Sequence, residues 1–402
     1  MRNQNEYDIL EIRDYYSSKN NPSGSTWVYD QVLSLSKTGY SPLVISPTPV
    51  IPLKRIFKNK FRLYDSPSIR IEDYKGTKVI RPPYFKIPNN KFVGLTLRNL
   101  SNCIGKYGNC EGIKLIHAHF GQNGVAALEL KEKLNVPLIT SFYGYDSGRL
   151  GKIYRPHYKE LIWGGDVFLA LSQDMKKDLM KLGFPAEKII IHHLGVDFDF
   201  FNTGNIKTDK FTLLSVARLD PAKGIQYIIR AFKKFLERNP NEQLKIQYKI
   251  VGGGVYEKEL KLLVKELQIE SNVVFINNLV LPNSREIVIN EMKKCDIFLL
   301  CSFTPTDGSK EGTPVVLMEA QACGKPCIAT FHAGIPEVVI NNKTGILTHE
   351  KDVNEIVNAI ERLYFNDLIR HQYGGNANNH IGREFNNKKQ MENLAGLFNS
   401  LI

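Results

Sequence analysis

The chain alternates short, mainly apolar runs with longer stretches in which apolar residues recur every three to four positions. The runs at 211–217 and 296–302 are apolar almost throughout, which is typical of strands buried on both faces of a parallel sheet. The stretches at 225–238 and 353–364 have helical periodicity instead. Strands that alternate with helices along the whole chain predict an α/β protein with doubly wound sheets.

The length of the chain predicts two domains. A chain of 402 residues is long for one ordinary domain and fits two of about 150–200 residues each. A polar, glycine-bearing stretch at 202–209 marks the boundary between them. We therefore expect one domain over 1–202 and a second over 203–384.

One strand, loop and helix carry the densest candidate chemistry. A polar loop follows the apolar run at 296–302, and the loop leads into a helix. We expect Thr313 to cap that helix, Pro314 to occupy its first position and Gly324 to follow its last turn. The loop then lies at the carboxyl end of a strand, where ligands bind in open α/β sheets.

Two carboxylates, Glu311 and Glu319, lie before and inside this helix. The backbone N–H groups of the first turn, over 312–316, have no partner within the helix and can bind a phosphate. The two acids then lie on either side of that phosphate, where they can accept hydrogen bonds from the sugar hydroxyls of a nucleotide sugar. The alternative is a solvated loop acid at Glu311 and a helix-dipole partner at Glu319.

Two cations follow another predicted strand. Arg218 and Lys223 lie five positions apart in the loop after the run at 211–217, a placement that suits a diphosphate. Ordinary surface cations are the alternative. Asn278 lies at the end of a further predicted strand, 273–280, next to Leu279.

Three loops of the first domain carry further candidates. Strands over 114–121 and 137–146 run into loops that hold His119 and Asp146, and for each residue a structural role is an open alternative. The loop at 15–26 contains Gly24, where the backbone could approach a substrate closely, or which could be an ordinary turn.

These motifs together resemble retaining glycosyltransferase family 4, including its E-x7-E signature. The resemblance is carried by E-G-T-P-x-x-L-x-E-A at 311–320, Gly324-Lys325-Pro326, Gly334-Ile335-Pro336-Glu337, Arg218 with Pro221 and Lys223-Gly224, H-A-H-F-G at 117–121 and S-F-Y-G-Y-D at 141–146. In the last segment Tyr143 stands where the family commonly has a histidine that contacts the donor sugar.

The resemblance implies the GT-B fold, with two Rossmann-like domains that face a central cleft and a terminal helix, about 385–402, that packs back on the first domain. It implies that Glu311 orients the donor sugar, Glu319 binds the ribose, Arg218 and Lys223 bind the diphosphate, and His119 takes part in catalysis. The remaining donor and acceptor contacts that it implies are Gly24, Tyr143, Asp146, Asn278, Leu279, Gly312, Thr313, Pro314, Val315 and Leu317.

The implied activity is the metal-independent transfer of a hexose from a nucleoside diphosphate to a hydroxyl of a growing, lipid-linked cell-surface polysaccharide. The nucleotide sugar is a co-substrate, and we expect no cofactor. We expect no metal site. Two alternatives are a non-catalytic nucleotide-sugar or glycan-binding protein and a nucleotide-sugar epimerase on the same fold.

Charge and composition add a candidate partner. The net charge is +12, and cations interleave with aromatic residues at 54–62, which suits an anionic membrane surface. A solvated basic loop is the alternative, and nucleic acid is disfavoured because no nucleic-acid-binding module accompanies the charge. The absence of an apolar run long enough to span a membrane and of an N-terminal secretory signal predicts a cytoplasmic protein, peripheral on the inner face of the cell membrane.

Overall fold

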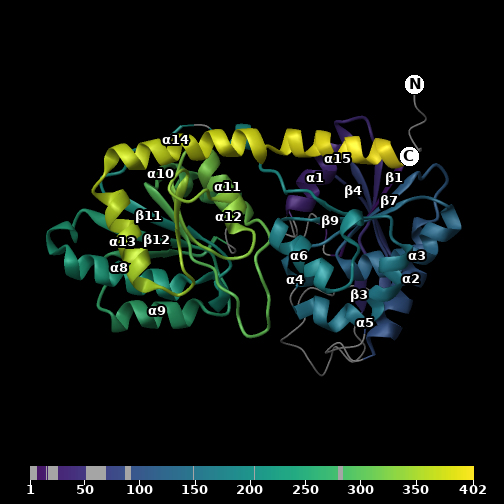
Figure 1. Cartoon of the computed structure of the whole chain (residues 1–402), viewed down its shortest axis with the longest axis horizontal. Helices are drawn as coiled ribbons and strands as arrows, with labels where there is room; N and C mark the ends of the chain where they lie inside the picture. The colour runs from purple at the N-terminus through teal and green to yellow at the C-terminus, as the bar shows by residue number, and fades with distance from the viewer. Residues whose placement is uncertain are drawn as a thin grey trace. The chain divides into compact units, whose positions relative to one another are not determined.

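The computed structural model describes residues 7–14, 16, 26–50, 69–86, 92–147, 149–202, 204–278 and 284–402. The chain forms two compact units (Figure 1). Unit 1 comprises residues 1–193 and 388–402, and unit 2 comprises residues 194–387. Among the described residues, no helix combines the length and the apolar character needed to cross a membrane.

Unit 1 is built on an eight-stranded sheet in the order β10-β9-β8-β7-β1-β2-β5-β4, in which only the β4–β5 pair is antiparallel. A separate two-stranded parallel sheet joins β3 to β6. The strands are β1 (Ile9–Ile12), β2 (Pro42–Ile45), β3 (Thr48–Val50), β4 (Arg70–Tyr74), β5 (Thr77–Arg81), β6 (Pro83–Phe85), β7 (Leu115–His119), β8 (Leu138–Ser141), β9 (Val167–Ala170) and β10 (Ile189–Ile191).

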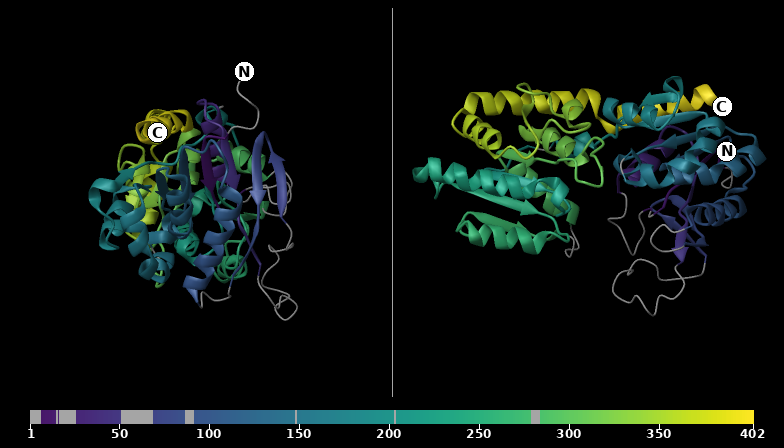
Figure 2. Two further views of the ribbon diagram at one scale, coloured as in Figure 1. Left: turned by 90° about the vertical axis from the view of Figure 1, so that its right-hand side faces the viewer. Right: turned by 60° about the horizontal axis from the view of Figure 1, so that its bottom comes forward.

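Helices cover this sheet on both faces. They are α1 (Thr26–Ser36), α2 (Val93–Gly108), α3 (Gly121–Leu134), α4 (Gly144–Ser147), α5 (Arg149–Gly164), α6 (Gln173–Lys181) and α15 (Asn387–Leu401). Although α15 ends the chain, its side chains Met391, Leu394 and Phe398 pack against the central strands of unit 1 (yellow in Figure 2). The hydroxyl of Tyr40 also donates to Asn399 Oδ1 of this helix at 2.6 Å.

Unit 2 contains a six-stranded parallel sheet in the order β13-β12-β11-β14-β15-β16. Its strands are β11 (Phe211–Val216), β12 (Ile246–Val251), β13 (Val273–Ile276), β14 (Ile297–Leu300), β15 (Cys327–Thr330) and β16 (Gly345–Thr348). From β11 to β13 each strand lies nearer to one edge of the sheet, and from β14 to β16 each strand lies nearer to the opposite edge. The strand order therefore reverses between β11 and β14.

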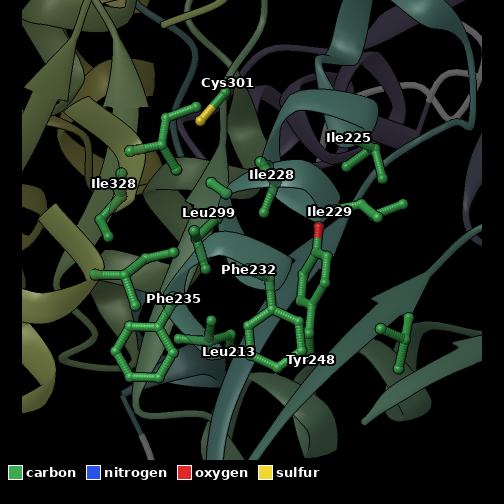
Figure 3. Close-up of a cluster of buried hydrophobic side chains, with 14 of the residues drawn as sticks. Leu213, Ile225, Ile228, Ile229, Phe232, Phe235, Tyr248, Leu299, Cys301 and Ile328 are labelled. Carbon is green, nitrogen blue, oxygen red and sulfur yellow. The ribbon is translucent and has the colours of Figure 1, made fainter. Parts of the chain in front are cut away.

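Two apolar cores pack against the faces of this sheet. One joins it to α8 (Ile225–Arg238), α9 (Glu257–Glu266) and α13 (Val353–Tyr364), with Phe232, Phe235 and Tyr248 among its largest side chains (Figure 3). The other joins it to α7 (Phe198–Phe201), α10 (Ser284–Lys294), α11 (Val315–Ala322), α12 (Ile335–Val338) and α14 (Asp367–Glu384).

The sequence predicted the parallel α/β architecture correctly, and the helices at Ile225–Arg238 and Val353–Tyr364 have the predicted bounds. It did not predict α5 or α14. Helix α14 contains three asparagines and three glycines, which are poor helix formers. Packing overrides this propensity. At Gly374 it also requires a glycine, because a Cβ there would lie 2.2 Å from the carbonyl oxygen of Gly324.

Candidate functional site

The candidate residues of unit 2 gather at the carboxyl edge of its sheet. Arg218 and Lys223 follow β11, Glu311 follows β14, and the loop after β15 carries a further polar residue, His332. Because β11 and β14 flank the reversal of strand order, these loops meet where ligands bind in doubly wound sheets.

A glycine lets the β11 and β14 loops approach each other. Gly224 has φ +71°, and a Cβ at this position would lie 1.8 Å from the carbonyl oxygen of Cys301. The backbone N–H of Phe303 also donates to Ala222 O at 3.0 Å. The close packing of the two loops places Lys223 beside the carboxylate that precedes α11.

Lys223 and Glu311 form an ion pair at this junction, with side-chain exposures of 21% and 17%. The Ser302 hydroxyl donates to Glu311 Oε1 at 2.9 Å. Burial by itself raises the pKa of Glu311, but the Lys223 cation and the hydrogen bonds from Lys223 and Ser302 outweigh it and lower that pKa. Glu311 is therefore an oriented carboxylate that stays ionised at neutral pH.

His332 and Glu350 complete this network, and the sequence analysis missed both. The Glu311 N–H donates to His332 Nε2 at 3.1 Å, and His332 Nδ1 lies 2.7 Å from Glu350 Oε1. His332 lies two positions before the segment Gly334-Ile335-Pro336-Glu337, which belongs to the family resemblance. A polar residue two positions after an apolar strand is the signal that could have found it.

The N-terminus of α11 differs from the prediction. The helix begins at Val315, its N-cap residue is Pro314, and no side chain caps it. The expectation that Thr313 caps the helix is therefore wrong, because Pro314 has extended backbone angles and moves the start of the helix past the reach of the threonine side chain. Within the described residues, the buried Thr313 hydroxyl has no hydrogen-bond partner. The expected glycine after the last turn is confirmed, since Gly324 has φ +70°.

The other predicted positions of unit 2 lie around this network. The Arg218 guanidinium is 59% exposed and pairs with Asp220 through Nη2 at 2.7 Å. Glu319 is partly exposed in the second turn of α11, and Gly312 and Val315 are also partly exposed, whereas Leu317 is in the core. Asn278 is buried and donates to Ser284 Oγ at 2.8 Å.

In unit 1, His119 belongs to a buried chain of hydrogen bonds. His119 Nε2 lies 2.9 Å and His117 Nδ1 3.0 Å from the same oxygen of Glu11. A carboxylate can only accept, so both of these ring nitrogens carry protons. The opposite nitrogens accept from hydroxyls, His117 from Ser141 at 2.8 Å and His119 from Tyr143 at 2.6 Å.

The pKa values of the groups in this chain of hydrogen bonds follow from their burial and from their contacts with one another. Burial raises the pKa of Glu11, but attraction to His117 and hydrogen bonds from both imidazoles outweigh it, so that pKa falls to about 2. Burial and the neighbouring His117 lower the pKa of His119 to about 4. The side chains of His117 and His119 are fully enclosed, which fits the structural alternative for His119 better than contact with a substrate.

Asp146 ties the two predicted loops of unit 1 together. Its carboxylate accepts from the Tyr143 N–H at 2.9 Å and from the Gly121 N–H at 3.3 Å. Burial raises the pKa of Asp146 to about 7, against the effect of these two bonds. The expected positions Gly24, Leu279 and 54–62 lie outside the described residues.

Among the described residues, Glu11, His117 and His119 also form a group whose ligand atoms lie close enough to hold a metal ion, within 4.8 Å of one another. Hydrogen bonds engage both nitrogens of each imidazole. These bonds account for the arrangement of the three side chains without an ion.

Comparison with known proteins identifies the family. The model of Glycosyl transferases group 1 matches residues 197–380, and that of Glycosyltransferase Family 4 matches residues 24–200. The chain therefore belongs to the family 4, group 1 glycosyltransferases, and the resemblance drawn from its motifs is confirmed.

Two relatives are named for the biosynthesis of colanic acid and of amylovoran. The putative colanic acid biosynthesis glycosyltransferase WcaL of Escherichia coli is 34% identical over 68% of this chain and 67% of its own length. The amylovoran biosynthesis glycosyltransferase AmsK of Erwinia amylovora is 32% identical over 61% of this chain and 60% of its own length. The chain thus spans about 60–67% of the length of these relatives.

Solved structures with the same fold are more distant in sequence. Sucrose-phosphate synthase from Thermosynechococcus elongatus matches with a TM-score of 0.76 at 19% identity and covers 98% of this chain and 99% of its own. Anabaena HepE in complex with UDP and glucose matches with a TM-score of 0.72 at 17% identity and covers 98% and 100%. These neighbours are GT-B glycosyltransferases, and the two Rossmann-like units of this chain have that fold.

Proposed function

We propose that this chain is a retaining glycosyltransferase that moves a hexose from a nucleoside diphosphate to a hydroxyl of a growing, lipid-linked cell-surface polysaccharide. The observation that carries the proposal is the Lys223–Glu311 ion pair beside the N-terminus of α11. It combines a cation for a diphosphate, a fixed carboxylate for sugar hydroxyls and a helix N-terminus for phosphate oxygens.

The buried Thr313 hydroxyl is independent support for an anionic ligand at this helix end. A buried hydroxyl without a partner costs free energy on the order of 1–3 kcal/mol, and a phosphate oxygen of a bound donor would satisfy it. The donor then lies with its diphosphate at Thr313 and α11, its hexose at Glu311 and its ribose at Glu319. Asn278 and Leu279 contact the base.

The chemistry follows from the charge that develops. As the bond between the anomeric carbon and the diphosphate breaks, the electron pair leaves with the diphosphate. Arg218, Lys223 and the N–H groups of α11 stabilise that charge, a task worth several kcal/mol. The acceptor oxygen bonds to the same face of the sugar, and its proton passes to the departing phosphate. In this scheme neither a protein nucleophile nor a metal ion is required.

The names of two relatives support the proposed acceptor, and the name of one solved structure supports the proposed donor. WcaL and AmsK are named for colanic acid and amylovoran biosynthesis, and the HepE structure is named for a complex with UDP and glucose. We therefore place UDP-hexoses first among the donors to test and lipid-linked glycans first among the acceptors.

Donor consumption tests this function. The wild-type protein should release nucleoside diphosphate from one member of a panel of nucleotide sugars, and faster when crude bacterial lipid acceptors are added. Glu311→Ala should lower this rate about tenfold or more, because the carboxylate that orients the hexose is lost. Glu291→Ala, which removes the α10 carboxylate that pairs with Lys249 at 2.6 Å and with Lys294 at 3.2 Å, is the control and should retain the rate.

Two results would contradict the proposal. Donor binding without turnover, with acceptor present, would identify a sugar-binding protein. Conversion of the free nucleotide sugar into its epimer, with no nucleoside diphosphate released, would identify an epimerase.

A second part of the proposal concerns the membrane. We propose that 54–62 and one face of α5 hold unit 1 on an anionic inner-membrane surface. On α5, Lys152, Arg155 and Lys159 are exposed, and Trp163 at its end is 78% exposed. Cations and an indole ring along one helix face suit lipid headgroups, where each cation contributes about 1 kcal/mol.

Vesicle sedimentation tests the α5 face. The protein should pellet with vesicles that contain phosphatidylglycerol and remain in solution with phosphatidylcholine alone, and salt should release it. Arg155→Glu with Lys159→Glu should weaken the binding at least tenfold. Lys258→Glu with Lys265→Glu on α9 makes the same charge change in unit 2 and should have a smaller effect. Equal pelleting with both lipids would rule out an electrostatic membrane contact.

A further inference from the structure

We infer that His332 is a positioning residue for Glu311, acting through the backbone N–H of that residue rather than by touching a substrate. The inference rests on the proposed function, in which the Glu311 carboxylate binds the donor sugar. It assigns a task to a residue that belongs to neither the E-x7-E signature nor the cation loop.

The hydrogen bonds fix the tautomer of His332. The Glu311 N–H is a donor, so His332 Nε2, 3.1 Å away, must accept. The ring proton then lies on Nδ1, which faces Glu350 Oε1 at 2.7 Å. The other oxygen of Glu350 accepts from the Thr304 N–H at 3.2 Å, so the carboxylate is itself held in place.

Because His332 is buried, the loss of these hydrogen bonds would not be compensated by water. The His332 side chain is 2% exposed, and water is not available to replace the acceptor that it offers to Glu311. The backbone that carries His332 is held by two further bonds. The Thr330 hydroxyl donates to Ser302 O at 2.5 Å, and the Ile335 N–H donates to His332 O at 3.0 Å.

Glu311 is thus held from two sides. His332 fixes its backbone, while Lys223 and Ser302 fix its carboxylate. Without the bond to His332, the backbone at Glu311 could rotate, and the Glu311 carboxylate would leave the position set by Lys223. Misplacement by about 1 Å can cost on the order of 10²-fold in rate.

Two substitutions separate the bonds that His332 makes. In His332→Gln the side-chain amide reaches about as far as Nε2, so its oxygen can still accept from the Glu311 N–H, while the contact with Glu350 is lost. In His332→Asn the shorter amide takes the place of Nδ1 and can still meet Glu350, while the acceptor for Glu311 is lost. The proposal requires the Gln variant to be the more active one.

The experiment combines kinetics with UDP binding. With the donor found in the panel, kcat should fall roughly 10–100-fold in His332→Asn and less than about fivefold in His332→Gln. The Kd for UDP, which lacks the hexose, should stay within about twofold in both variants. An Asn variant as active as the Gln variant, or a loss of UDP binding that equals the loss of kcat, would overturn the inference.

A second measurement does not depend on turnover. Nitrogen-15 NMR of protein labelled in histidine should show His332, assigned by its absence from His332→Gln, as the Nδ1–H tautomer. The Glu311 amide should exchange with deuterium more slowly in the wild type than in His332→Asn. If the wild type transfers no sugar, the proposed function fails while this readout still tests the geometry; the other tautomer, or equal exchange, overturns the inference itself.

Discussion

Lys223→Met lowers kcat for sugar transfer by about 10²–10³-fold and weakens nucleoside diphosphate binding by less than about tenfold. Negative charge grows on the diphosphate as the anomeric bond breaks, so a cation held at this point stabilises the transition state more than the bound donor. Steady-state kinetics and titration calorimetry measure the two quantities.

A second readout of the same variant follows from Glu311. Lys223 lowers the pKa of this carboxyl in the wild type, against the effect of burial. Removal of the cation therefore raises that pKa, and the acid limb of the pH–rate profile should move to higher pH in Lys223→Met. A structural role for Lys223 would not move this limb.

Lys249→Met is the matched control. Lys249 pairs with Glu291 at 2.6 Å and is buried to a similar degree, but it lies within β12 rather than in a loop at the strand ends. Its loss should lower the melting temperature and leave kcat within about twofold. Unchanged turnover in Lys223→Met, or an equal loss in both variants, would contradict the role given to Lys223.

The residues of this site were predictable where a local motif carries them. Lys223 and Glu311 each lie in a short loop after an apolar strand, next to the glycines and prolines that shape it, so a few neighbouring residues indicate the chemistry. His332 was not predictable in this way. Its partner Glu311 is 21 positions away, and the contact exists only because β14 and β15 are neighbours in the sheet.

The same reasoning explains two failures of prediction. Thr313 precedes a proline and an apolar run, which is the pattern of a capping residue, yet the extended backbone of Pro314 delays the start of the helix. Glu11 lies inside the strand Ile9–Ile12 and shows no motif, since its partners His117 and His119 are 106 and 108 positions away. Only the pairing of β1 with β7 brings them together.

The buried network around Glu11 should contribute stability to unit 1 that is lost in acid. His119 binds a proton at a pKa of about 4 in the folded state, against 6.5 for an ordinary histidine. Between these values the unfolded state binds more protons, so stability falls as the pH falls. Glu11, whose pKa is lowered to about 2, adds a further loss of stability, which begins as the pH falls to near the ordinary pKa of 4.5.

We expect His119 and Glu11 together to contribute a loss of about 2–3 kcal/mol in the free energy of unfolding of unit 1 from pH 7 to pH 4, since one unit of pKa difference corresponds to about 1.4 kcal/mol. Asp146, whose pKa is raised to about 7, contributes in the opposite direction, so the prediction concerns the difference between the wild type and a variant that lacks His119. Hydrogen exchange read by mass spectrometry measures this on the whole protein, because peptides of the two units are distinguished. His119→Asn removes the group that titrates first, and this variant should show a shallower decline in unit 1 than the wild type, although its stability at pH 7 is lower.

The exposed His371 of α14 provides the control, and His371→Asn should leave the decline in unit 1 unchanged. A decline that is equally steep in His119→Asn would show that other groups govern the response to acid. A shallower decline would show that Glu11 and the two imidazoles stabilise the loops that hold Tyr143 and Asp146 only while His119 is neutral. The burial of His119 would then make it a pH-dependent support of the fold.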